Sequence, residues 1–185
     1  DYSNLLGNDL AAAGGGGGTA QFNAGAVSIW GLEWAGSYDL FIPNTSVRMP
    51  LSLVYTFTES SFNSSFDSDY GPWGQVIKGD ALPYLPKHQW SLGWGLEVDD
   101  IQGNVIYRHQ SDIRTEAGQS TIDDANSIEG HHIIDLSIAY SINAWSTFQF
   151  HLRNVLDTRY AVAARPAGYR PGLPRMVEAG IKLDF

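Results

Sequence analysis

The sequence predicts an all-β protein, folded as an antiparallel up-and-down β-barrel that crosses a membrane. Three observations favour this fold class: apolar and polar residues alternate with a period of two, long and short connections alternate strictly, and aromatic residues make up 12% of the 185 residues. Transmembrane barrels carry aromatic girdles where their strands meet the lipid headgroups. The chain has no run of about eighteen apolar residues, which excludes a membrane-crossing helix.

The composition narrows the possible partners and cofactors. A net charge of −9 argues against nucleic-acid binding, because that needs cationic residues to displace counterions from phosphates. The chain has no cysteine, which excludes disulfides, thiolate zinc sites and iron–sulfur clusters. It begins at Asp1 without Met or a signal peptide, so we expect a piece of a longer precursor.

The closing strand, 175–185, has the clearest alternation of apolar and polar residues. Val177, Ile181 and Leu183 fall on one face, whereas Glu178 and Lys182 fall on the other. Alternation alone leaves both senses open, since a soluble sandwich buries its apolar face and a membrane barrel turns it to lipid. Seven further strands are expected by the same pattern, at 1–6, 25–41, 47–58, 88–98, 104–108, 134–140 and 147–153.

The connections between these strands favour the membrane barrel. Long polar or glycine-rich segments alternate with short turns, and an outer-membrane barrel sorts its connections in this way between its two ends. The polar faces carry charged residues that suit a wet lumen: Glu33, Arg48, Glu97, Arg108, Asp135, Arg153, Glu178 and Lys182. The apolar residues expected to face lipid are Trp30, Leu32, Trp34, Met49, Leu51, Leu53, Trp90, Leu92, Trp94, Leu136, Ile138, Phe148, Phe150, Ile181 and Leu183.

Four stretches carry a resemblance to a known family. They read DYSNLLGND at 1–9, GDALPYLPKHQ at 79–89, RNVLDTRY at 153–160 and RPAGYRPGLPR at 165–175. In order, and with the terminal Phe185, they resemble the C-terminal barrel of TonB-dependent outer-membrane receptors. The closest likeness is to the ferric-dicitrate receptor branch.

The resemblance implies a fold, a place and a function. It implies a barrel of about 22 strands with an N-terminal plug, which imports ferric chelates across the outer membrane of a Gram-negative bacterium with energy from TonB. Residues 1–185 would be about the last eight strands, with the plug and the earlier strands absent from this sequence. TonB would act through the missing N-terminal part. The barrel-insertion machinery would read Phe185.

Arginines are the expected ligand-binding residues. Arg165 and Arg170 lie in the last long segment and Arg153 lies on the polar face, and guanidinium forks match carboxylates such as those of ferric citrate. The alternative is that the arginines of this segment, which also include Arg159 and Arg175, pair with Asp157 or neighbouring carboxylates and only hold the loop. No catalytic residue, metal ligand or cofactor is expected.

Two other classes of protein stay open at this stage. An outer-membrane barrel enzyme would be built around His151 and Asp135, although no nucleophile motif supports it. A soluble β-sandwich that binds carbohydrate would use exposed tryptophans as sugar platforms. The neighbours His131 and His132 do not form a metal pair in this interpretation, because adjacent side chains of a strand point to opposite faces.

Overall fold

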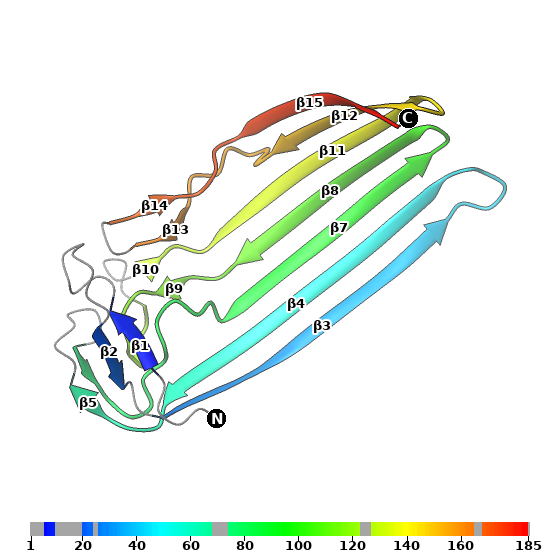
Figure 1. Cartoon of the computed structure of the whole chain (residues 1–185). Coiled ribbons are helices and arrows are strands. Elements are labelled where there is room, and N and C mark those ends of the chain that lie inside the picture. The colour runs from blue at the N-terminus through cyan, green and yellow to red at the C-terminus, as the bar shows by residue number, and fades with distance from the viewer. Residues whose placement is uncertain are drawn as a thin grey trace.

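The structure is a computed structural model that describes residues 6–9, 20–23, 26–67, 74–122, 127–164 and 168–184. These residues form strands, turns and loops, and none of them belongs to a helix long and apolar enough to cross a membrane. One large antiparallel sheet dominates the molecule (Figure 1). The all-β antiparallel prediction is confirmed.

The large sheet has seven strands in the order β15-β12-β11-β8-β7-β4-β3. Each strand pairs with its neighbours in the chain, which is the up-and-down topology that the sequence predicted. The strands are β3 (Val27–Phe41), β4 (Arg48–Phe62), β7 (His88–Val98), β8 (Ile101–Gln110), β11 (His131–Asn143), β12 (Ser146–Arg153) and β15 (Met176–Leu183). Strands β4, β8 and β11 run further toward the long loops than their alternation indicated, because their hydrogen-bonded register continues there.

Small two-stranded sheets lie beside the large one. The strand expected at 1–6 lies mostly outside the described residues, and β1, which begins at Leu6, pairs with β2 instead of joining the large sheet. The small strands are β1 (Leu6–Asp9), β2 (Ala20–Asn23), β5 (Phe66–Asp67), β6 (Gln75–Val76), β9 (Ile113–Arg114), β10 (Ser127–Ile128), β13 (Ala161–Ala163) and β14 (Arg170–Pro171).

The connections are sorted between the two ends of the sheet. The short turns 42–47, 99–100 and 144–145 lie at one end, and the long segments 63–87, 111–130 and 154–175 lie at the other (Figure 1). Asn44 and Asp99 take positive φ angles of 61° and 49° in the short turns, a conformation that Asn and Asp tolerate. The chain ends beside the short turns, although Phe185 itself lies outside the described residues. The predicted alternation is confirmed.

Cross-strand register joins the apolar sides of the strands into one continuous face. Along one row, Trp34 pairs with Tyr55, Tyr55 with Trp90 and Trp90 with His109, and paired residues share a face. Many of the side chains on this face are exposed, with 59% for Leu32 and 64% for Ile181. No second sheet of the described residues packs on them. The predicted orientation toward lipid is therefore supported for the six strands that carry the predicted residues.

The opposite face is polar and is crossed by ion pairs between strands. Arg48 binds Asp39 at 2.7 Å and Glu97 at 3.1 Å, which links β3, β4 and β7 near the short turns. Further along the sheet, Arg108 of β8 pairs with Asp135 of β11. These charges would be costly in hydrocarbon, so the polar face belongs to water.

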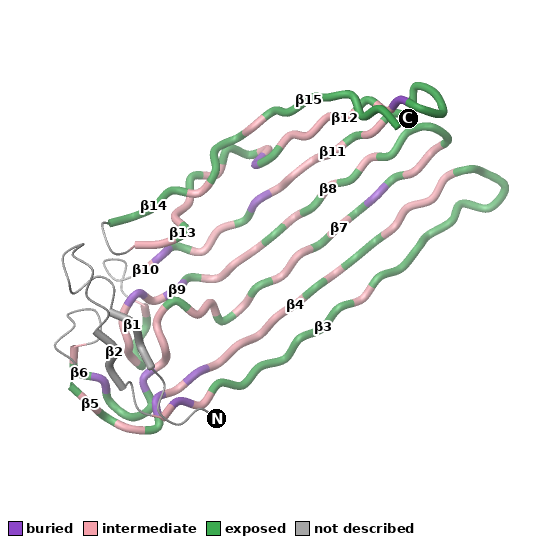
Figure 2. The backbone as a smooth tube through the Cα atoms, in the orientation of Figure 1, coloured by how far each residue is buried: buried purple, intermediate pink, exposed green. Residues whose placement is uncertain are grey.

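The buried core lies at the long-loop end (Figure 2). Val27, Phe62 and Val76 are at most 1% exposed, and they bring the ends of β3 and β4 against the 63–87 segment. Asp80, itself only 6% exposed, accepts hydrogen bonds from the Ile77 amide and from Gln119 of the 111–130 segment. Asp80 therefore joins the 63–87 and 111–130 segments by hydrogen bonds at the long-loop end of the sheet.

The two faces give a direct test of the orientation. Ile138→Arg places a cation on the apolar face, where we expect a destabilisation of about 2–4 kcal/mol if the position lies near the bilayer midplane. Ala139→Arg is the matched control, since the neighbouring residue points to the polar face. Urea unfolding of the receptor in lipid vesicles measures both. Equal losses of stability for the two variants would contradict the orientation.

Candidate ligand-binding site

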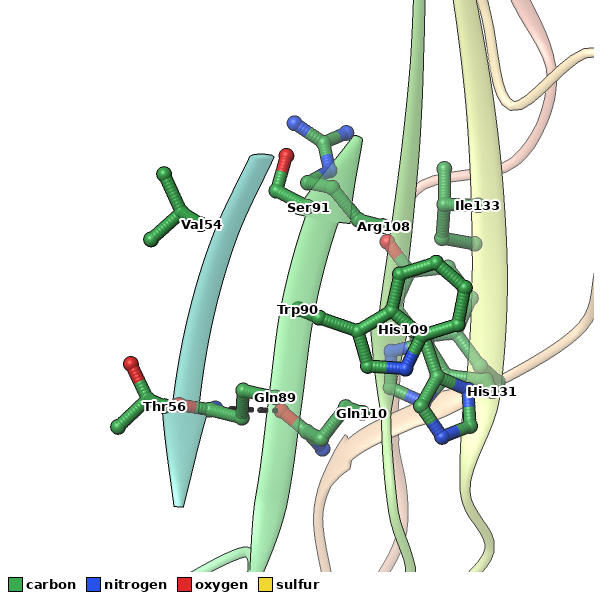
Figure 3. Close-up of a pocket in the computed structure, with 11 residues that line it drawn as sticks. Val54, Thr56, Gln89, Trp90, Ser91, Arg108, His109, Gln110, His131 and Ile133 are labelled. Carbon is green, nitrogen blue, oxygen red and sulfur yellow. Dashed lines mark hydrogen bonds between the residues drawn. The ribbon is translucent and has the colours of Figure 1, made fainter. Parts of the chain in front are cut away.

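A pocket of ≈ 410 Å³ lies against β4, β7, β8 and β11 near the long-loop end (Figure 3). Its floor includes a cross-strand row in which Gln89, Gln110 and His131 are register partners on the polar face. The Gln89 side chain donates to that of Gln110 over 3.4 Å. The Arg108 side chain, on the same face, adds a cation to this wall. Amides, an imidazole and a guanidinium therefore converge where the sheet meets the loops.

Tyr160 closes this region from the side of the last long loop. Its ring lies on the His131 ring with 4.3 Å between the centroids and 29° between the planes. Tyr160 also lines two adjoining pockets, one beside Arg159 and Tyr169 and the other beside Arg153. The loop after β12 thus supplies an aromatic wall shared by all three hollows.

Asn154 fixes the base of that loop. Its backbone amide donates to Asp135 Oδ1 over 2.8 Å, its side-chain Nδ2 donates to the Thr158 and Leu173 carbonyls, and its Oδ1 accepts from the Thr158 amide. The residue is 2% exposed and has a φ of 49°, which Asn adopts more readily than most residues. One side chain therefore joins the start and the end of the 154–175 segment.

The neighbouring charges secure the same base. Asp135 accepts from Arg108 as well as from the Asn154 amide, so both of its oxygens have partners. Asp157 accepts from the Arg175 amide over 3.1 Å, and its carboxylate lies 3.7 Å from the Arg175 guanidinium. The predicted alternative, in which loop arginines pair with Asp157, is confirmed for Arg175.

The three arginines expected to bind ligand have different surroundings. Arg153 lies on the polar face and lines a pocket, where its Nε donates to Glu178 over 3.2 Å and leaves both Nη groups without a partner among the described residues. Arg170, on β14, is exposed and has no ion pair within the described part of the chain. Arg165 lies outside the described residues. Arg159 lines the pocket beside Tyr169.

The histidines do not form the sites that the other interpretations needed. His151 is the cross-strand partner of Ser137, whereas Asp135 accepts hydrogen bonds from Arg108 and Asn154. His151 and Asp135, the two residues around which an enzyme would be built, therefore share no hydrogen bond. His131 and His132 point to opposite faces, as predicted. Within the described ranges, no three His, Asp or Glu side chains gather to hold a metal ion.

Several residues of the site were missed at the sequence level. Gln89, Gln110 and His131 lie in separate strands, and only the register of β7, β8 and β11 brings them together. Tyr160 was part of a quoted stretch, but its place over His131 depends on the fold of the loop. In the sequence these residues could be recognised as polar residues at the strand ends next to the long loops.

A sheet with one continuous apolar face, one charged face and its long loops at a single end defines an outer-membrane β-barrel protein. A family model described as "TonB dependent receptor-like, beta-barrel" matches residues 1–155. The chain belongs to this family, whose members are outer-membrane proteins of Gram-negative bacteria.

The relatives give the same assignment. Catecholate siderophore receptor Fiu of Escherichia coli strain UTI89 is 29% identical over 159 residues, which are 84% of this chain and 20% of that receptor. Fiu of strain K12 matches with the same identity and coverage. The chain therefore spans 20% of the length of the curated relatives that it matches. They are named as receptors, not enzymes.

A solved structure supports the fold. The closed-form crystal structure of the ferric-catecholate import receptor Fiu from E. coli K12 superposes with a TM-score of 0.51, at 19% identity, over 85% of this chain and 28% of that one. These relatives are catecholate receptors, whereas the resemblance pointed to the ferric-dicitrate branch. The comparisons leave that branch, the 22-stranded barrel and the missing plug as predictions.

The base of the last loop can be tested at Asn154. Asn154→Gly keeps the positive φ angle but removes the side-chain hydrogen bonds, so we expect about 1–3 kcal/mol lower stability and faster trypsin cleavage at Arg159. Asn104→Gly, on the same polar face, is the control for glycine itself. If trypsin cleaves the Asn154 variant at the parent's rate, the Asn154 side chain does not hold the two ends of the 154–175 segment together.

Proposed function

We propose that this chain is part of a TonB-dependent receptor that takes up a ferric chelate across the outer membrane. The observation that carries the proposal is the family match over residues 1–155, together with a polar sheet face that holds a pocket near the long-loop end. The action is binding and gated passage, without covalent chemistry. TonB would be contacted by parts of the receptor outside residues 1–185.

The chemistry of the candidate site suits an anionic chelate with aromatic or carboxylate ligands. Arg108 and Arg153 supply guanidinium donors at the pocket wall, and Arg170 is exposed on the loop side without an ion pair among the described residues. Tyr160 and His131 offer a flat aromatic surface beside them. Both ferric citrate, from the sequence resemblance, and a ferric catecholate, from the names of the relatives, fit this description.

The absence of a reaction is also part of the proposal. Asp135, which a barrel enzyme would pair with His151, is instead engaged by Arg108 and the Asn154 amide. These two contacts favour a structural role for the Asp135 carboxylate. A pocket that binds a ligand through hydrogen-bond donors and aromatic rings needs no general base.

The arginine hypothesis is tested by uptake in the full-length receptor. Arg165→Ala with Arg170→Ala, or Arg153→Gln alone, should reduce uptake of a labelled anionic ferric chelate about tenfold at low concentration, because each loses charged hydrogen bonds. Lys182→Gln, a cation paired with Asp184 near the short turns, is the matched control. Parent-like uptake at matched receptor levels would leave these arginines with only a structural role. Loss of uptake in the control as well would point to a general effect of charge.

The end of the last strand gives a separate test of assembly. We propose that the barrel-insertion machinery reads the terminal aromatic Phe185, so its deletion from the full-length receptor should lower the amount in the outer membrane several-fold. Phe185→Tyr, which keeps an aromatic terminus, is the control. Immunoblots of outer-membrane fractions measure both. Unchanged insertion of the deletion would make Phe185 an interface anchor only.

A further inference from the structure

Two histidines face each other across neighbouring strands on the apolar face. His109 of β8 and His132 of β11 are direct register partners, so their Cβ atoms are about 4.5–5.5 Å apart. Their rings lie nearly parallel, with 6.5 Å between the centroids and 22° between the planes. The pair sits at the long-loop end of both strands, where β8 leads into the 111–130 segment and β11 follows it.

Neither imidazole of this pair has a hydrogen-bond partner within the part of the chain that the structure describes. Aromatic rings lie beside both imidazoles, with Trp90 next to His109 and Tyr107 next to His132. By contrast, His88, the other described histidine on this face, shares a 2.9 Å hydrogen bond with Tyr55. The His109 and His132 nitrogens are therefore available as ligands.

Imidazole nitrogens are good ligands for Cu²⁺, Ni²⁺ and Zn²⁺. Two nitrogens that bind one ion at about 2.0–2.1 Å lie at most roughly 4 Å apart. Rotation about the side-chain bonds brings the tips of two opposed imidazoles within that span, because their Cβ atoms are already close. Both residues lie at the long-loop end of their strands, where a barrel wall meets water, and His132 is exposed while His109 is half-buried. An ion can therefore reach the pair from the aqueous side.

We propose that His109 and His132 form an open two-histidine site for a divalent transition-metal ion on the outer surface of the barrel wall. No third His, Asp or Glu joins them within the described ranges, so water fills the other coordination positions and the ion exchanges readily. The two side chains leave the sheet on the face opposite Gln110 and His131. His109 and His132 also border the pockets at this end, so the metal site adjoins the candidate ligand-binding site. It does not rest on the proposed function.

The test uses the full-length receptor in detergent, purified without a histidine tag, and CuCl₂ as the probe. Calorimetry should show that the parent binds one more equivalent of Cu²⁺ than His109→Ala or His132→Ala does. If the number of equivalents is the same, each variant should bind Cu²⁺ at least tenfold more weakly than the parent. His131→Ala is the matched control, because it removes the adjacent imidazole from the opposite face and should bind as the parent does. His88→Ala controls for a histidine on the same face.

A spectroscopic measurement on the parent keeps the test independent of whether the variants fold. The electron paramagnetic resonance spectrum of Cu²⁺ added at one equivalent should carry the splitting from two nitrogen donors. A spectrum without paired nitrogen donors, equal Cu²⁺ binding by parent and both variants, or an equal loss in His131→Ala would each overturn the proposal.

Discussion

The pairing of main-chain hydrogen bonds is the constraint on which the rest of the structure depends. In hydrocarbon an unpaired amide or carbonyl has no water to bind, so membrane-crossing strands must be fully paired with their neighbours. Continuous register between β3 and β4, with Val27 to Phe41 paired to Phe62 to Arg48, meets that demand where these two strands face each other. The large sheet has edges at β3 and β15, and in a bilayer these edges require further strands beside them. The charged face, the loops and the pockets are arranged on this paired frame.

Alternation in the sequence was sufficient for the faces and the order of the strands. A residue such as Trp34 or Leu92 can lie on only two possible faces, and the polar residues that alternate with it along the strand decide between them. Register was beyond reach, because sliding one strand by two residues keeps every face unchanged. For this reason the row of Gln89, Gln110 and His131, and the pairing of His109 with His132, could not be derived before the strands were placed.

For the last long loop, the important residues could be recognised in the sequence but their contacts could not be predicted. Its motif residues were evident in the sequence, but their contacts depend on side chains that come from other strands. Asn154 binds both ends of the loop and rests on Asp135, and Tyr160 needs His131 beneath it. A short polar residue such as Asn is a turn signal in any sequence. Its role as a clamp becomes apparent only when Leu173 and Thr158 are seen on either side of it.

The opposite orientations of His131 and His132 have a wider meaning. One peptide bond separates a side chain that meets the aqueous interior from one that meets the membrane boundary. Odd and even positions of β11 therefore experience different solvents, and each set can change under selection without disturbing the other. Substitutions on the polar side of such a wall can change what it contacts there while the apolar side keeps its fit to lipid. Substitutions on the apolar side can in turn suit another membrane and leave the polar side as it was.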